Sequence, residues 1–293
     1  MHSRDVARED NETRALAGRW TVPHHYAGAM TAASEPPSPR RGTQAIQRAL
    51  GILWALADEG ELSIIELANA TGLTAGTAAR MAKALAAEGM LRRNPATDAY
   101  HLGARTAVLG QAAQRVLGLD KARPAMEELG AATQESINLS IREGHESVVL
   151  LRVQSTLALR YEQTVGARFP LYSTSSGKAI LAFSEDVDTF IAGLPERLPP
   201  VAPGTLATRR QLVQQLEEIR AQGYSTDIEE NVEGVRCVGA PVLDEQGRAR
   251  AALVLQAPAV RMDRHRMEEL GQLLRPAATE IAHVIPDDRS LST

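Results

Sequence analysis

Residues 62–93 read LSIIELANATGLTAGTAARMAKALAAEGMLRR, and this stretch decides the fold of the N-terminal part of the chain. Ser63-Ile-Ile-Glu66 has the spacing of a capping box, which opens a short helix. Gly72 then permits a tight turn, because glycine adopts backbone angles that other residues avoid. Thr74 can cap a second helix that ends at Gly89. The apolar side chains of that helix recur at helical spacing, at Ala78, Met81, Ala82 and Leu85.

A further helix and a β-hairpin flank this pair of helices. The residues after Gln44 carry the apolar stripe of a helix, and residues 91–103 alternate and turn like a hairpin, with Asn94-Pro95 and Thr97-Asp98 at its tip. Three helices, a glycine turn between the second and third, and then a hairpin predict a winged helix-turn-helix. The stripe of the first helix is Ala45, Ala49, Ile52, Leu53 and Leu56.

Charge is unevenly distributed over this predicted domain. Arg80 and Lys83 lie off the apolar face of its third helix, and Arg92-Arg93 opens the hairpin, whereas acidic side chains gather within residues 58–61. Such polarity favours binding to DNA over a small helical domain of no special purpose. The candidate DNA-contacting residues are Arg48, Thr74, Gly76, Thr77, Arg80, Lys83, Arg92 and Arg93.

The composition is ordinary for a soluble protein. The chain has 293 residues, of which 44% are apolar and 23% are charged, and this length suits about two domains. A single cysteine excludes an intramolecular disulfide and a cysteine-rich zinc site. Because no apolar run is long enough for a membrane span or a signal peptide, we expect a cytoplasmic protein without membrane contact. The net charge of −4 argues only weakly against nucleic acid, and three Phe, two Trp and five Tyr are few for a protein that stacks single-stranded bases.

The pattern divides the chain into five segments. The first is polar and proline-rich at its end, with no apolar periodicity, and it contains Met30 as a second possible start. We expect a disordered leader over 1–42, the winged helix-turn-helix over 43–104, a linking and dimerising helix over 105–122, a second domain over 123–286 and a tail over 287–293.

The linking helix has an apolar stripe that is unusual between two domains. The stripe either packs within its own chain or forms a contact with a second copy. We prefer the contact, because two winged domains need a fixed spacing to read two half-sites. Its residues are Val108, Leu109, Ala112, Val116 and Leu117.

The second domain mixes strands and helices. Two strands are expected around a turn at Glu143–His145, and residues 168–173 read as a further short strand. Thr208-Arg-Arg-Gln211 is another capping box, and Asp263 can cap a long last helix. With more strands near residues 224–256, the pattern predicts an α+β fold: a mostly antiparallel sheet with flanking helices that binds a ligand.

The single cysteine, Cys237, lies in EGVRCVGAPV, residues 233–242. A catalytic cysteine needs a base, and no histidine shares a motif with it. SSGKA resembles a phosphate loop only superficially, since Tyr172 and Ala179 stand where glycine and serine or threonine belong. With no metal-ligand spacing either, we expect neither an enzyme nor a metal or other cofactor.

Small and polar residues indicate a pocket for a small molecule. Ser175-Ser176-Gly177 opens a helix, where free N–H groups attract an anion, although a plain serine cap is the more common explanation. Cys237 and Gly239 share a strand face with Val235. Asp227 and Glu229 would share a face of the neighbouring strand, where a buried carboxyl needs a partner.

Together these segments resemble the IclR family of bacterial transcriptional regulators over residues 43–286. TQAIQRALGILWAL and residues 62–93 are similar to its helix-turn-helix. GARFPLYSTSSGKAILA and YSTDIEENVEGVRCVGAPVLDEQGRARAALVLQAP are similar to two longer signatures of its effector-binding half.

The resemblance implies a repressor or activator that binds a double-stranded DNA operator and senses a metabolite. It implies a GAF/PAS-like α/β effector domain, a homodimer or tetramer, and a small organic or aromatic acid as effector. The effector-binding candidates are Tyr161, Ser175, Ser176, Gly177, Asp227, Cys237, Val254 and Gln256.

Some positions depart from the family pattern. Val254 and Gln256 stand where sensors of two-carbon keto acids have two serines, so we expect an effector that is larger or less polar. Ala75-Gly76 replace Lys-Ser before the recognition helix, which leaves more of the DNA affinity to the arginines and Lys83. Tyr172 replaces a common histidine. The alternative function is a small-molecule-processing enzyme with an N-terminal protein-interaction module.

Overall fold

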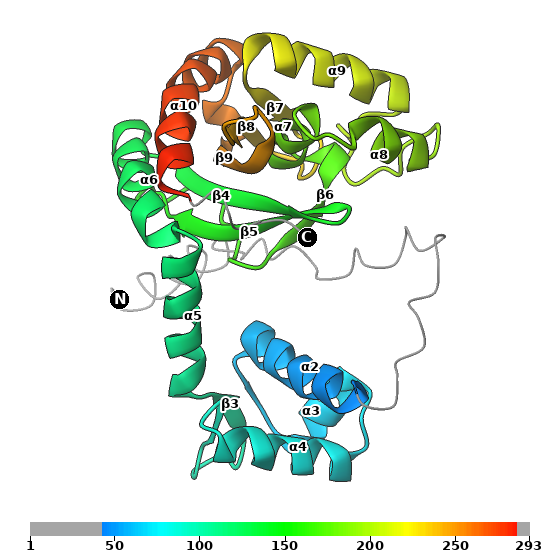
Figure 1. Cartoon of the computed structure of the whole chain (residues 1–293), viewed down its shortest axis with the longest axis vertical. Helices are drawn as coiled ribbons and strands as arrows, with labels where there is room; N and C mark the ends of the chain where they lie inside the picture. Colours follow the sequence, from blue (N-terminus) through cyan, green and yellow to red (C-terminus); the bar gives the residue numbers. More distant parts are fainter. Residues whose placement is uncertain (1–42, 286–293) are drawn as a thin grey trace, which may run out of the picture. The chain divides into compact units, whose positions relative to one another are not determined.

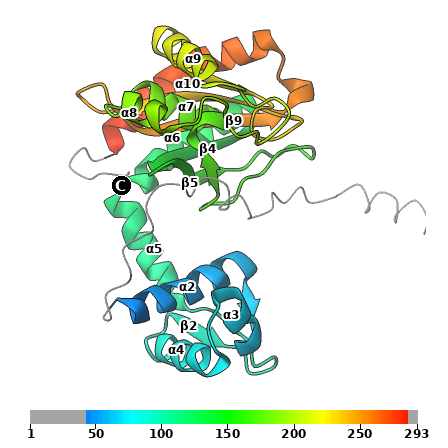
Figure 2. The same cartoon turned by 90° about the vertical axis from the view of Figure 1, so that its right-hand side faces the viewer.

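The computed structural model describes residues 43–285, which form two compact units, 43–121 and 122–285 (Figures 1 and 2). The predicted leader at 1–42, with the question of Met30, and the predicted tail at 287–293 lie outside the described residues. No helix within residues 43–285 is long and apolar enough to cross a membrane.

The first unit is the expected winged helix-turn-helix. The Ser63 hydroxyl accepts a hydrogen bond from the Glu66 N–H, and the Glu66 carboxylate accepts one from the Ser63 N–H, so the capping box is confirmed. A short strand that the sequence did not reveal pairs with the second strand of the hairpin. The elements are α2 (Gln44–Glu59), β1 (Glu61–Leu62), α3 (Ile64–Thr71), α4 (Ala75–Ala87), β2 (Leu91–Arg93) and β3 (Tyr100–Leu102).

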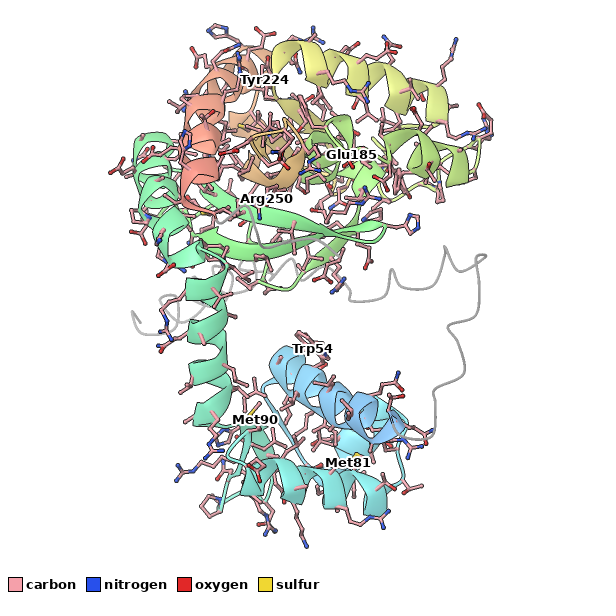
Figure 3. The ribbon with its side chains drawn as sticks, viewed as in Figure 1. Trp54, Met81, Met90, Glu185, Tyr224 and Arg250 are labelled. Atoms are coloured by element: carbon pink, nitrogen blue, oxygen red, sulfur yellow. The ribbon has the colours of Figure 1, made fainter. Side chains whose placement is uncertain are left out.

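The turn between α3 and α4 fixes how the two helices pack. Gly72 has φ of 65°, and the Thr74 hydroxyl accepts a hydrogen bond from the Thr77 N–H at the start of α4. Apolar side chains from α2, α3 and α4 meet in one core, whereas Trp54 lies on the exposed side of α2 (Figure 3). The fully buried members of that core include Ile52, Leu56, Leu67, Ala78 and Ala82.

The linking helix, α5 (Ala104–Val116), buries none of its residues. Val108 is 62% exposed and Leu109 is 58% exposed, and Val116 is exposed as well. Among the described residues, these three side chains of the stripe therefore remain exposed, whereas Ala112 and Leu117 are half-buried.

The second unit is a six-stranded antiparallel sheet with helices on both faces (Figures 1 and 2). The strand order is β6-β5-β4-β9-β8-β7. The strands are β4 (Ser136–Glu143), β5 (Glu146–Val153), β6 (Arg168–Pro170), β7 (Ser225–Ile228), β8 (Val235–Leu243) and β9 (Ala249–Pro258). The helices are α6 (Leu119–Thr133), α7 (Ser175–Ala182), α8 (Val187–Gly193), α9 (Arg209–Gln222) and α10 (Arg264–Val284).

Successive side chains of β8 point to opposite faces of the sheet, and a different helix packs on each face. Gly239 faces α7, where an added Cβ would lie 2.9 Å from the Ser225 Oγ and 3.2 Å from the Ser175 main chain, so glycine favours this close approach. Val238 and Ala240 turn to the opposite face, on which α10 packs, and both are completely buried. Small residues on the first face thus bring α7 close to the sheet.

One expected strand of this unit needs correction, and one helix was not predicted. The strand expected over 168–173 ends at Pro170, and Leu171–Ser173 form a 3-10 turn that leads into α7. Proline lacks the N–H that would continue the ladder. Helix α8 was not predicted, because Phe190 is its single buried residue and one apolar position produces no helical periodicity.

Gly177 allows a similar close approach between α7 and the turn before it. A Cβ at this position would lie 2.2 Å from the Leu171 carbonyl oxygen. We predict that Gly177→Ala lowers the free energy of unfolding by about 1–3 kcal/mol, because the backbone must shift. Gly193→Ala in α8 is the matched control, since no atom lies within 4 Å of its added Cβ. Urea unfolding followed by circular dichroism measures both variants, and equal stabilities would contradict this packing.

Candidate functional site

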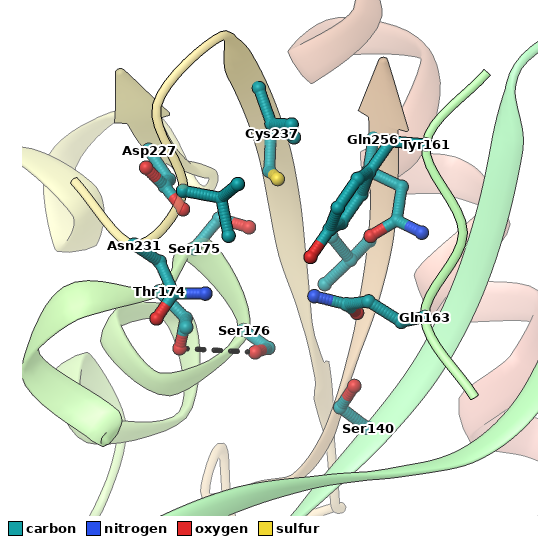
Figure 4. A pocket seen from close by; sticks show the side chains of 13 residues that line it. Ser140, Tyr161, Gln163, Thr174, Ser175, Ser176, Asp227, Asn231, Cys237 and Gln256 are labelled. Carbon is teal, nitrogen blue, oxygen red and sulfur yellow. Dashed lines mark hydrogen bonds between the residues drawn. The ribbon is translucent and has the colours of Figure 1, made fainter. Parts of the chain in front are cut away.

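A small polar cavity lies between the start of α7 and the sheet of the second unit (Figure 4). It offers about 10 Å³ to the centres of water molecules, which is room for about one water. Of the predicted effector-binding residues, seven line this cavity and Gly177 does not. The seven are Tyr161, Ser175, Ser176, Asp227, Cys237, Val254 and Gln256.

Strand register brings three of these residues into one row. Asp227 on β7 pairs with Cys237 on β8, and Cys237 pairs with Gln256 on β9. Ser136 on β4 continues the row beyond Gln256. Directly opposite residues of neighbouring antiparallel strands point to the same face, so Asp227, Cys237 and Gln256 together form one wall of the cavity.

The start of α7 forms the other side of the cavity. Thr174 caps this helix, since its hydroxyl accepts a hydrogen bond from the Gly177 N–H at 3.0 Å. Ser175 and Ser176 therefore do not act as ordinary serine caps. The Ser176 hydroxyl is hydrogen-bonded to that of Ser147 at 2.7 Å. Val235, expected on the same strand face as Cys237, also lines the cavity. The lining residues that were not predicted are Ser140, Gln163, Thr174, Asn231 and Val232.

A buried ion pair joins Lys178 of α7 to Glu230, which follows β7. The Lys178 side chain is 0% exposed, and its Nζ donates to both carboxylate oxygens of Glu230 at 2.6 Å and to the Gln215 amide oxygen at 2.7 Å. The pair joins α7 to α9 and to the segment after β7. In the sequence, Lys178 stands out only within SSGKA, and local patterns give no sign of its partners Gln215 and Glu230.

The expectation that Asp227 and Glu229 share a strand face is wrong. β7 ends at Ile228, and Glu229 has φ of 61°, so the alternation stops before it. The Glu229 carboxylate instead accepts hydrogen bonds from Arg236. The carboxyl near Asp227 is that of Glu230, whose N–H donates to the Asp227 Oδ1 at 2.7 Å.

Burial changes the proton affinity of the side chains in the row. The pKa of Asp227 is raised to about 7, mainly by burial and also by the nearby Glu230, whereas Lys178 and backbone N–H groups partly oppose the rise. Burial also raises the pKa of the Cys237 thiol, with a further increase from Asp227. The thiol is therefore protonated at neutral pH and is a poor nucleophile. Cys237 serves as a small side chain in the wall.

Buried polar atoms at the same wall lack hydrogen-bond partners. They are Oε1 and Nε2 of Gln256, the Tyr161 hydroxyl and Oδ1 of Asn138. Burial raises the pKa of Tyr161, and Cys237 raises it further, so the hydroxyl keeps its proton. An unpaired buried group costs about 1–3 kcal/mol, which makes such a cluster in one place unusual. No group of His, Cys, Asp and Glu within residues 43–285 could hold a metal ion.

The predicted DNA-contacting residues lie in the first unit. Thr74, Gly76, Arg80 and Lys83 are exposed on α4, and Thr77 is half-buried beside Thr74. Arg48 is half-buried on α2.

Arg92 and Arg93 are successive strand residues, so they point to opposite sides of the hairpin. The Arg93 guanidinium is paired with the Asp98 carboxylate at 2.8 Å. Arg92 is exposed as well, but it forms no ion pair with the described residues.

Two family models match the chain. The IclR helix-turn-helix domain matches residues 45–95, and the bacterial transcriptional regulator IclR C-terminal domain matches residues 111–283. The chain belongs to the IclR family.

Individual relatives agree with this assignment. The HTH-type transcriptional regulator BhcR of Paracoccus denitrificans is 32% identical over 82% of this chain and 87% of its own length. The crystal structure of the Thermotoga maritima IclR has a TM-score of 0.69 at 28% identity and covers 81% of this chain and 97% of that chain. An IclR homologue from Microbacterium hydrocarbonoxydans, complexed with 4-hydroxybenzoate, has a TM-score of 0.70 at 24% identity over 82% of this chain and 98% of that chain.

The family assignment confirms the fold class and the general function. This IclR-family chain is a helix-turn-helix transcriptional regulator with an antiparallel sheet in its C-terminal domain. Its relatives are named as transcriptional regulators and not as enzymes.

We predict that Lys178→Met lowers the free energy of unfolding by about 3–5 kcal/mol, because it leaves the Glu230 carboxylate buried without its cation. Adding Glu230→Gln to this variant should restore much of the loss. Arg209→Met is the control, since it breaks an exposed pair with Glu196, which contributes at most about 1 kcal/mol. Urea unfolding measures all of them, and a Lys178→Met variant as stable as the control would exclude a structural role for the pair.

The pKa of Asp227 predicts a pH dependence. It is about 7 in the folded chain against an ordinary 3.8. Between these values the folded state binds one proton more than the unfolded state. The stability of the wild type relative to Asp227→Asn should therefore fall as pH rises from about 4 to about 7, with a limiting slope of roughly 1.4 kcal/mol per pH unit.

Urea unfolding at a series of pH values measures this difference. Asp186→Asn is the control, because hydrogen bonds from Arg142 lower the pKa of Asp186, which places its effect in more acidic solution. A flat difference between the wild type and Asp227→Asn from pH 4 to 7 would contradict the raised pKa.

Proposed function

We propose that this regulator binds an operator through its winged helix-turn-helix and that a small acid in the cavity between α7 and the sheet changes its affinity for DNA. The observation that carries the proposal is this polar cavity, buried inside the C-terminal domain of a helix-turn-helix regulator. A repressor and an activator would both use this arrangement, and DNA binding would take place in the cytoplasm.

In the proposed complex, α4 is the recognition helix in the major groove. Its exposed Arg80 and Lys83 and the threonines at its start would reach base edges and phosphates. Arg48 and Arg92 would contact the backbone, and Arg93 would do so after leaving Asp98. Because Gly76 offers no side chain, the arginines and Lys83 would supply most of the affinity.

The effector we propose is a carboxylic or aromatic acid. Its carboxylate would meet the hydroxyls and the N–H groups at the start of α7, near Ser175 and Ser176. Val254 supplies no hydroxyl on β9, which favours an effector larger than a two-carbon keto acid. An effector larger than one water requires the wall residues to move apart. The binding of 4-hydroxybenzoate by the Microbacterium homologue makes benzoates a reasonable first set of compounds to screen.

We also propose that α5 forms a contact between two copies of the chain. Val108 and Leu109 expose apolar surface that would otherwise remain in water. A dimer, or a tetramer made of two dimers, would place two recognition helices at a fixed spacing.

DNA binding is tested by two arginine variants. We predict that Arg80→Ala weakens operator binding by about 1–3 kcal/mol and relaxes its sequence preference. Arg93→Ala should weaken binding to all sequences and reduce the slope of affinity against salt by about one. Fluorescence anisotropy with the intergenic DNA upstream of the gene measures both, and Arg209→Ala in the other domain is the control. Wild-type binding by both variants would place the DNA-binding face elsewhere.

A further inference from the structure

The Gln256 side chain is buried in the cavity wall with both of its amide atoms unpaired. It is 1% exposed, and no described residue accepts from its Nε2 or donates to its Oε1. A buried amide normally finds partners for both atoms.

The neighbours of Gln256 in the sheet do not supply these partners. On one side is the Cys237 thiol, a weak donor that remains protonated. On the other side is Ser136, whose hydroxyl donates to the Tyr161 carbonyl at 3.2 Å and accepts from the Ser155 N–H at 3.2 Å. The amide of Gln256 is therefore left to bond with whatever occupies the cavity.

The surroundings of Gln256 are polar but carry no positive charge. Figure 4 shows Tyr161, Gln163 and Gln256 on the side of the cavity opposite Thr174 and Ser176. Within residues 43–285, no lysine, arginine or histidine lines the cavity, and the one carboxyl in its lining is that of Asp227. This wall thus offers donors and acceptors together without a cation for an anion to pair with.

We propose that the effector carries a neutral group with a donor and an acceptor side by side, such as a carboxamide, ureido or lactam group, and that this group pairs with the Gln256 amide. The proposal rests on the function proposed above, in which the acid end of the effector meets the start of α7. An amide would satisfy both atoms of Gln256 at once, through two parallel hydrogen bonds. A hydroxyl has a single oxygen, so it cannot form these two parallel hydrogen bonds.

The same geometry disfavours other groups at this end. A second carboxylate only accepts hydrogen bonds, so it could not donate to the Gln256 Oε1. It would also lie near the Asp227 carboxyl with no cation beside it. An alkyl group would leave both amide atoms unpaired. Gln256 thereby selects for the neutral polar group against an anion and against an apolar group of the same shape.

Matched compounds test this selection. The aromatic set is 4-carbamoylbenzoate, terephthalate and 4-isopropylbenzoate, and the aliphatic set is succinamate, succinate and 4-methylpentanoate. Within each set the compounds share one carboxylate and differ only in the opposite end. Isothermal titration calorimetry uses the full chain, its Gln256→Met variant, which keeps the length but removes both amide atoms, and Gln214→Met on the exposed side of α9 as the control.

We expect the carbamoyl acid of at least one set to bind the wild type about 10- to 100-fold more tightly than both partners. The preference should disappear in Gln256→Met and remain in Gln214→Met. A dicarboxylate or alkyl acid that binds as tightly as the carbamoyl acid, a preference that survives in Gln256→Met, or no binding by either set would overturn the proposal. If Gln256→Met fails to fold, the wild-type ranking alone decides.

Measuring operator binding in the same samples distinguishes a failure of the Gln256 assignment from a failure of the proposed DNA-binding function. If DNA binding responds to a plain acid or a dicarboxylate with no preference for amides, the proposed function stands and the assignment to Gln256 falls. If the wild-type chain does not bind operator DNA, the proposed function itself fails.

Discussion

The buried ion pair between Lys178 and Glu230 is the interaction on which the effector domain depends most. A lysine inside a protein is tolerated only when a carboxylate and further acceptors surround its charge. Here these groups come from the segment after β7 and from α9, so one side chain of α7 holds three parts of the domain together. Gly177, the preceding residue, allows α7 to approach the turn at Leu171 closely enough for these contacts.

This arrangement also determines the chemistry of the cavity. Burial and the nearby Glu230 carboxylate raise the pKa of Asp227 to about 7, and Lys178, which is paired with Glu230, opposes this rise only in part. With this pKa, Asp227 is about half ionised at pH 7, and the row from Asp227 through Cys237 to Gln256 becomes neutral in more acidic solution. The start of α7 on one side and a wall without a cation on the other make the two ends of the cavity chemically different.

The sequence predicts the helix-turn-helix well because its signals are local. The capping box at Ser63 and Glu66, the turn at Gly72 and the cap at Thr74 each lie within a few residues, and all were found in the structure. The cavity wall depends instead on strand register between segments far apart in the chain, which local patterns do not encode.

Errors in the site arose where a short segment leaves its regular pattern. The alternation of β7 pointed to Glu229, but the strand ends one residue earlier, and Glu230 became the buried carboxylate. Gln256 stood out in the sequence only as a departure from the family pattern. Its unpaired amide became visible once the positions of Ser136 and Cys237 were known.

The central claim is that an acid in this cavity controls DNA binding. The most direct measurement is the operator affinity of the wild type and of Cys237→Ser, by fluorescence anisotropy, across a titration with benzoates and aliphatic acids. The account predicts that both proteins bind the operator equally without acid, and that the acid concentration needed to change binding differs between them. Loss of DNA binding in Cys237→Ser alone, or a wild-type affinity that no acid alters, would contradict it.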